Sequence, residues 1–204
     1  MTSETTCPIE GMPVPQLRVG IVGGPRWRLC DQKPKHFTLL VVHRGAGCSS
    51  CGGLLHRIDA RLGEFRRRGV AVVALSADDR PTTERFADAL GIDRLPLGYG
   101  FSAEDAADWG VELLPPAPGE DPGRPRCAFT LFLVRRDGTL EMREVPPQGD
   151  LPGVDEILAA VDAAIGEADA GADAARADAA DAARPLAQGS PVAEACPVAG
   201  AKAS

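Results

Sequence analysis

The strongest constraint on the fold is a run of six apolar or β-branched residues, Phe37–Val42, followed after His43 by a glycine-rich turn at 44–47. Strands that are buried on both faces of a sheet read as continuous apolar runs. Apolar residues then recur at helical spacing, at Leu55, Ile58, Leu62 and Phe65. Gly69 follows them, and glycine commonly ends a helix. The sequence therefore predicts a buried strand, a tight turn and a helix.

The same alternation of strand and helix continues along the chain. Val70–Leu75 reads as a second buried strand, and Thr82 or Thr83 is the expected cap of a helix that Gly91 closes. A short strand is expected at 95–99.

Three further elements complete the central region. Ser102 opens a capping-box-like segment, which predicts a helix reaching Trp109. Strands at 127–134 and 139–145 flank Arg136-Asp137-Gly138, a hairpin signal. An apolar stripe marks a closing helix, at Val154, Ile157, Leu158, Val161 and Ile165.

Buried strands that are joined by helices form a parallel sheet with both faces covered, and the hairpin adds antiparallel strands to it. We therefore expect an α/β protein with a mixed central sheet flanked by helices, in the layout of a thioredoxin-like fold with an insertion. Composition divides the chain into a flexible N-terminal arm at 1–22, a domain at 23–166 and a tail at 167–204 that is expected to be disordered or only weakly helical. The tail is rich in Ala and Asp and has no aromatic residue to bury.

Charge and hydropathy argue against several classes of function. The formal net charge of −7 is opposite in sign to the basic surface that binds nucleic acid. No apolar run approaches the roughly 20 residues that span a bilayer. The N-terminus lacks the basic and apolar segments of a secretion signal. We therefore expect a cytoplasmic protein, with reduced thiols, that binds neither nucleic acid nor membrane.

Two cysteines, Cys48 and Cys51, lie where the buried strand gives way to the helix. Amide groups at a helix N-terminus are unpaired and the helix dipole is positive there, which favours a thiolate at Cys48. Cys51 lies one turn further, close enough to attack a bond formed at Cys48. The pair predicts thiol redox chemistry. A metal site with His56 is an alternative, although structural zinc needs a fourth ligand.

The segment from Trp27 to Cys51 resembles the peroxiredoxin-like branch of the alkyl hydroperoxide reductase / thiol-specific antioxidant family, in which Arg-Gly and two further residues precede a Cys-x-x-Cys pair. Residues 69–78, 95–100 and 131–138 resemble later segments of the same family, in the same order. The resemblance covers roughly residues 23–165 and implies a thioredoxin fold with a peroxiredoxin-type insertion.

The sequence departs from this family pattern at three positions. His43 replaces the usual aromatic residue before Arg-Gly, and Ser49 stands where a proline is common. Phe129 occupies the place before the hairpin strand where relatives usually carry a proline. The common peroxiredoxin signature, Pro-x-x-x-Thr-x-x-Cys, is also missing.

The resemblance implies an antioxidant oxidoreductase in which Cys48 attacks a hydroperoxide and Cys51 converts the resulting sulfenic acid into a redox-active Cys48–Cys51 disulfide. An external dithiol, such as a thioredoxin-like protein, would reduce that disulfide, so no bound cofactor or metal is expected. A homodimer is compatible with this interpretation. Two alternatives stay open: a general thiol-disulfide oxidoreductase acting on protein partners, and a non-catalytic redox sensor or cargo protein.

Three further residues are candidates for the catalytic site. Arg44 is close to Cys48 in sequence and would stabilise its thiolate or polarise a peroxide. Arg126 resembles in position the arginine that peroxiredoxins point at their reactive cysteine. His43 would act on protons near neutral pH.

The four other cysteines receive separate interpretations. Cys30 and Cys127 are expected to be small apolar fillers beside strands. Cys7 and Cys196 each begin a Cys-Pro-(Ile or Val)-x-Gly segment. This repeat is interpreted as a chance recurrence, with a haem-iron ligand or a recruitment tag as alternatives.

Overall fold

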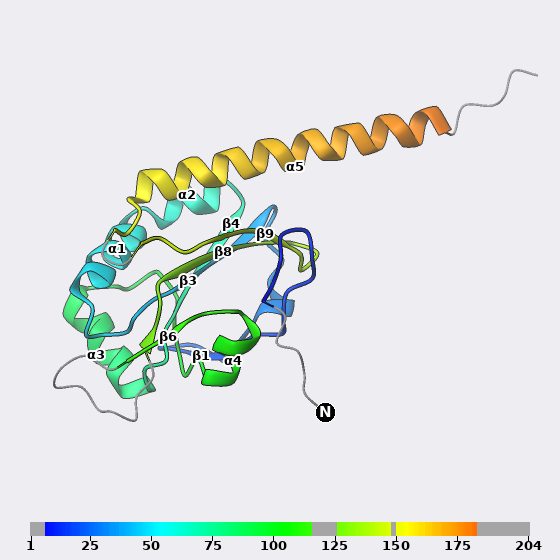
Figure 1. The fold of residues 1–204 in the computed structure, drawn as a ribbon. Coiled ribbons are helices and arrows are strands. Elements are labelled where there is room, and N and C mark those ends of the chain that lie inside the picture. Colours follow the sequence, from blue (N-terminus) through cyan, green and yellow to red (C-terminus); the bar gives the residue numbers. More distant parts are fainter. Residues whose placement is uncertain (1–6, 116–125, 148–149, 183–204) are drawn as a thin grey trace, which may run out of the picture. The chain divides into compact units, whose positions relative to one another are not determined.

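The computed structural model describes residues 7–115, 126–147 and 150–182. The strands of its main sheet are β1 (Arg18–Ile21), β2 (Trp27–Arg28), β3 (Phe37–Val42), β4 (Val70–Leu75), β5 (Leu97–Tyr99), β8 (Thr130–Arg135) and β9 (Leu140–Glu144). Within the described residues they are ordered β2-β1-β5-β4-β3-β8-β9 (Figure 1). β3 pairs parallel with β4 and antiparallel with β8, so the expected mixed sheet is confirmed.

The helices of the described residues are α1 (Ser49–Ala60), α2 (Leu62–Arg67), α3 (Arg80–Leu90), α4 (Ala103–Asp108) and α5 (Val154–Ala182), with a 3-10 turn η1 at Leu29–Asp31. The helix expected after Cys48 is divided at Arg61, whose φ of −106° and ψ of 13° are not helical. The cap of α3 is Asp79, which accepts the Thr82 amide, so the expected cap at Thr82 or Thr83 is wrong. The capping box at Ser102 is confirmed.

The core lies against the central strands. Every residue of β3 is buried, as expected for a strand with both faces covered. Trp109 packs edge-on against Phe132 with ring centroids 5.1 Å apart. The Asp137-Gly138 turn joins β8 to β9, with Gly138 at a φ of +87° that glycine adopts without strain. The predicted hairpin is therefore confirmed.

The N-terminal segment differs from the expected arm. Leu17 and Val19 are buried, and β1 pairs with both β2 and β5. Gly11 and Met12 exchange backbone hydrogen bonds with Leu140. The segment therefore packs on the sheet at least from residue 11, although its apolar pattern is too short to reveal this.

The strand expected at 127–134 forms two separate strands. β7 (Arg126–Cys127) pairs with β6 (Leu113–Leu114) in a small second sheet, and β8 begins only at Thr130. Thr130 pairs with Val42, the last residue of β3. Residues 126–129 therefore approach the carboxyl end of β3.

The chain divides into two units, residues 1–166 and 167–204. The first turns of α5 belong to the first unit and bury Val154, Ile157, Leu158 and Val161, so the closing helix is confirmed. In the second unit α5 continues up to Ala182, because the alanine-rich sequence favours a helix. Residues 183–204, with Cys196, lie outside the described residues. None of the described helices is long and apolar enough to span a membrane.

Candidate active site

Cys48 is the N-cap residue of α1, the position expected for it. Its backbone is extended, with φ −101° and ψ 99°, and the helix begins at Ser49. The turn before it is closed by the Cys48 amide, which donates to the Gly45 carbonyl at 3.2 Å. The Cys48 side chain thus lies beside the unpaired amides and the positive dipole of the first helical turn.

Cys51 contacts the Cys48 sulfur directly. The Cys51 amide lies 3.3 Å from Cys48 Sγ, and Ser50 Oγ lies 3.4 Å from the same atom. Both cysteines are free thiols in this structure, so no disulfide joins them. The two side chains nevertheless hydrogen-bond to each other. The arrangement therefore brings together the two sulfurs that the sequence pairs.

The two thiols differ in ionisation. A hydrogen bond from the Cys51 thiol is the main cause that lowers the pKa of Cys48 to about 5. Ser50, the Cys51 amide and the charge of Arg44 lower the pKa of Cys48 further, against the opposing effect of burial. The shared hydrogen bond with Cys48, together with burial, raises the pKa of Cys51 above its usual range. At neutral pH the pair is one thiolate and one thiol.

Cys48 is the more exposed of the two cysteines. Its residue surface is 7% exposed, whereas Cys51 is 0% exposed. A small reactant can therefore contact the Cys48 thiolate first. Cys48 thus combines the two properties that a nucleophilic thiol needs, which are ionisation and access.

Arg44 and Arg126 are both half-buried. Arg44 lies in the turn before Cys48, and its charge lowers the pKa of both cysteines. Arg126 lies in β7, and Thr130 places that segment at the carboxyl end of β3, where Cys48 follows. The role of Arg126 toward a peroxide stays a prediction.

His43 lies in a buried environment that does not suit a residue exchanging protons. It is 0% exposed, and burial lowers its pKa to about 4, so it is neutral near pH 7. Its Nδ1 accepts the Gly45 amide at 3.2 Å, and its ring stacks on Phe86. The expectation that His43 titrates near neutral pH is therefore wrong, because desolvation disfavours its charged form. His43 contacts the turn that leads to Cys48.

Asp78 was not expected among the site residues. It lies three residues beyond β4 and accepts the Ala46 amide at 2.8 Å through Oδ2. An acidic residue following a buried parallel strand was the available signal, because the carboxyl ends of parallel strands meet at one edge. Ser50 was also missed, since only the folded turn shows that its hydroxyl faces the sulfur.

Three further thiols lie within the described residues. Cys127 is fully buried, and burial raises its pKa to about 12, as a filler residue requires. Cys30 is exposed, so its expected filler role is wrong. Cys7 packs its sulfur against Gly110, leaving no room for a Cβ there.

The alternative metal site is not supported by the position of His56. Its Nδ1 lies 2.9 Å from the Leu90 carbonyl oxygen, and the residue is exposed. Over the described residues, no group of three or more His, Cys, Asp or Glu side chains could hold a metal ion.

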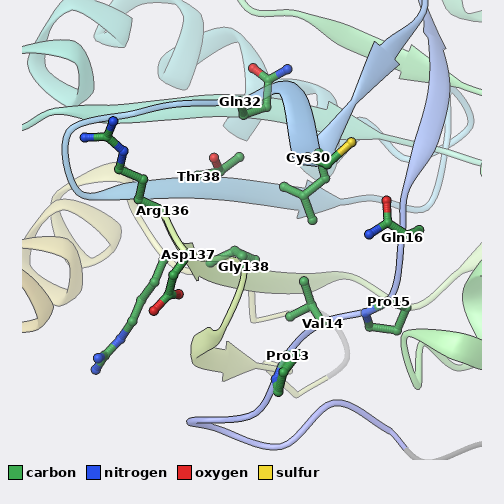
Figure 2. A pocket seen from close by; sticks show the side chains of 13 residues that line it. Pro13, Val14, Pro15, Gln16, Cys30, Gln32, Thr38, Arg136, Asp137 and Gly138 are labelled. Carbon is green, nitrogen blue, oxygen red and sulfur yellow. The ribbon is translucent and has the colours of Figure 1, made fainter.

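A cavity of about 260 Å³ lies near the amino end of β3, between the segment 13–16, η1 and the β8–β9 turn (Figure 2). Thr38 and Cys30 both line it. About 13 Å of strand separate Thr38 from Val42 at 3.3 Å per residue. The cavity is therefore distinct from the Cys48 site, which follows the other end of β3.

Fold and site together define a thioredoxin-like protein with an ionised cysteine at the start of a helix. The sequence matches the AhpC/TSA family over residues 11–143, and the chain belongs to that family. It is accordingly a thiol peroxidase of the peroxiredoxin type. No curated protein sequence matches the chain.

Solved structures agree on the fold. The reduced 2-Cys peroxiredoxin of Plasmodium vivax is 19% identical, with a TM-score of 0.67 over 79% of this chain and 84% of that chain. AhpC of Enterococcus faecalis is 15% identical, with a TM-score of 0.66 over 81% and 97%. A peroxiredoxin-like protein of Aquifex aeolicus is 16% identical, with a TM-score of 0.63 over 78% and 89%. The thioredoxin-like fold is therefore confirmed.

Proposed function

We propose that this chain reduces hydroperoxides through Cys48 and forms a Cys48–Cys51 disulfide in each catalytic cycle. The observation that supports this proposal is the pairing of the Cys48 thiolate with Cys51, a protonated thiol whose amide donates to Cys48 Sγ at 3.3 Å. A thiolate is the reactive form of cysteine, and the neighbouring thiol is the group that can resolve its oxidised product.

In the first step the Cys48 thiolate attacks one peroxide oxygen and the O–O bond breaks. The leaving alkoxide takes up a proton and departs as an alcohol. Cys48 is oxidised by two electrons to a sulfenic acid, while the peroxide is reduced by two. The charge of Arg44 would stabilise the negative charge that moves from sulfur to oxygen.

In the second step the Cys51 sulfur attacks the sulfenic sulfur. An S–S bond forms, the S–O bond breaks, and the leaving hydroxide combines with the Cys51 proton as water. Because Cys48 caps α1 and Cys51 lies in its first turn, the disulfide needs only a local movement. An external dithiol, of the thioredoxin type, would then reduce the disulfide by exchange and become oxidised itself.

The proposal is tested by reacting the reduced protein with a stoichiometric amount of hydrogen peroxide and analysing the product. The reduced protein should lose about 2 Da, since two thiol hydrogens are lost, and peptide mapping should find Cys48 joined to Cys51. Cys48→Ser should abolish both the linkage and peroxide consumption. Cys30→Ser is the matched control, because that exposed cysteine lies outside the site. Peroxide consumption by Cys48→Ser at the parent rate would refute the proposal.

A second candidate function is general thiol-disulfide exchange with protein partners. The pairing of a thiolate of low pKa with a buried second thiol also suits this reaction. This function predicts that Cys51→Ala traps mixed disulfides with partner proteins, while the parent protein turns over peroxide slowly. A redox sensor or cargo protein would instead change partners when residues 167–204 are deleted, with the thiol chemistry of Cys48 unchanged.

A further inference from the structure

The turn between β3 and α1 is fixed by a carboxylate from a different part of the chain. Asp78 is 8% exposed, and its Oδ2 accepts the Ala46 amide at 2.8 Å. Ser76 Oγ lies 3.3 Å from the same oxygen and donates to it. These contacts join the end of β4 to the residues just before Cys48, across 32 positions of sequence.

Gly45 allows the turn to approach this carboxylate. Its φ of +97° is a conformation that favours glycine, and an added Cβ would lie 2.7 Å from Asp78 Oδ2. The Gly45 amide donates to His43 Nδ1, and its carbonyl accepts the Cys48 amide at 3.2 Å. The amides of Gly45, Ala46 and Cys48 therefore each have a defined partner, and the last of these contacts fixes Cys48 to the turn.

We propose that Asp78 is a positioning residue, which holds the 44–47 turn so that Cys48 stays at the start of α1 beside Arg44 and Cys51. Asp78 acts through the backbone of the turn and would touch neither the peroxide nor the reacting sulfur. The inference rests on the proposed function only in taking Cys48 as the nucleophile.

The direction in which the pKa of Cys48 changes when Asp78 is replaced distinguishes positioning from a direct electrostatic effect. A negative charge near a thiol raises the pKa of that thiol, and Asp78 acts in this way on Cys127. Removing the charge alone would therefore lower the pKa of Cys48 or leave it unchanged. Loosening the turn has the opposite effect, because the Cys51 hydrogen bond and the Arg44 charge lose their alignment with Cys48.

The experiment follows alkylation of Cys48 by iodoacetamide across pH in the full-length reduced protein, with peptide mass mapping to resolve Cys48 from Cys30. In Asp78→Ala we expect the midpoint to move upward from about 5. A move of about two pH units reduces the thiolate fraction at pH 6 about tenfold. Asp78→Asn retains an oxygen acceptor without the charge, and its midpoint should return close to that of the parent.

Asp79→Ala is the matched control. It removes the neighbouring carboxylate, which caps α3 through the Thr82 amide, and should leave the Cys48 midpoint in place even though the fold is weakened. Gly45→Ala disturbs the same contact from the other side, and it decides the question if Asp78→Ala does not fold. It should also move the midpoint upward.

A Cys48 midpoint in Asp78→Ala that is unchanged or lower would overturn the proposal, and so would an equal upward shift in Asp79→Ala. Alkylation involves no peroxide, so this result does not depend on peroxidase activity. Conversely, failure of the stoichiometric peroxide test would leave the alkylation result standing.

Discussion

The Cys51 amide lies 3.3 Å from Cys48 Sγ, so the second cysteine of the pair hydrogen-bonds the first before any oxidation occurs. The Cys51 thiol also donates to this sulfur, which places the negative charge on Cys48 and the proton on Cys51. The two residues therefore ionise as a unit, and the chemistry of either one depends on the other.

The rate of oxidation by peroxide should follow a single ionisation near pH 5. Because the thiolate is the reactive form, the second-order rate constant should stay constant from about pH 6 to about pH 8 and fall about tenfold per unit well below pH 5. His43, with a pKa near 4, adds no step in the neutral range. Stopped-flow measurement with hydrogen peroxide in excess would check this. A rise centred near pH 8.5 would contradict it, since that is the ionisation of an ordinary thiol.

Replacing Cys51 should change the ionisation of Cys48. Cys51→Ala removes the thiol that donates to the Cys48 sulfur, so the pKa of Cys48 should rise. Cys51→Ser keeps a donor at the same place and should raise the pKa of Cys48 less. The alkylation midpoint of Cys48 measures both variants. Equal midpoints for alanine and serine would show that the side-chain hydrogen bond does not control the charge on Cys48.

Arg44→Met should raise the pKa of Cys48 by a smaller amount than Cys51→Ala. The charge of Arg44 favours the thiolate, but it contributes less than the hydrogen bonds from Cys51 and Ser50. Arg57→Met is the control, because this exposed arginine lies in the last turn of α1. The same alkylation profile provides the comparison. A larger shift in Arg44→Met than in Cys51→Ala would reverse the order that the structure indicates.

Asp59→Ala should destabilise the fold by about 3 kcal/mol, because two backbone amides lose a charged acceptor. Asp59 Oδ1 accepts the amides of Arg94 and Leu95 at 2.7 and 2.6 Å, and the residue is buried. Asp155→Ala removes an exposed carboxylate paired with Arg61 and should cost less than about 1 kcal/mol. Urea denaturation measures both changes. Similar losses in the two variants would show that burial of Asp59 does not set its contribution.

Much of the fold could be predicted because its signals are local. Phe37–Val42 and Val70–Leu75 match β3 and β4 at both ends, since buried parallel strands read as unbroken apolar runs. The capping box at Ser102 and the turn at Gly138 depend on neighbouring residues and were also confirmed. By contrast, β1 is four residues long, and it is a strand through its pairing with β2 and β5 rather than through a local signal.

The candidate site was predictable to a similar extent. Placing Cys48 at the start of a helix needed only the order of strand, turn and helix. The roles of His43 and Asp78 depend on contacts with Phe86 and Ala46, which are distant in sequence, so composition and spacing could not reveal them. The low pKa of His43 likewise follows from complete burial. Judged by residue type alone, a histidine is expected to titrate near neutral pH, so burial had to be known to predict otherwise.

The contacts to the Cys48 sulfur also have an energetic consequence for the whole redox cycle. Every interaction that favours the thiolate stabilises the dithiol form of the pair and offers nothing to a sulfur bound in a disulfide. The midpoint potential of the couple is thereby shifted toward the oxidising side relative to a pair of ordinary thiols. An external dithiol would therefore reduce the Cys48–Cys51 disulfide readily, and this regeneration of the two thiols would be thermodynamically favourable.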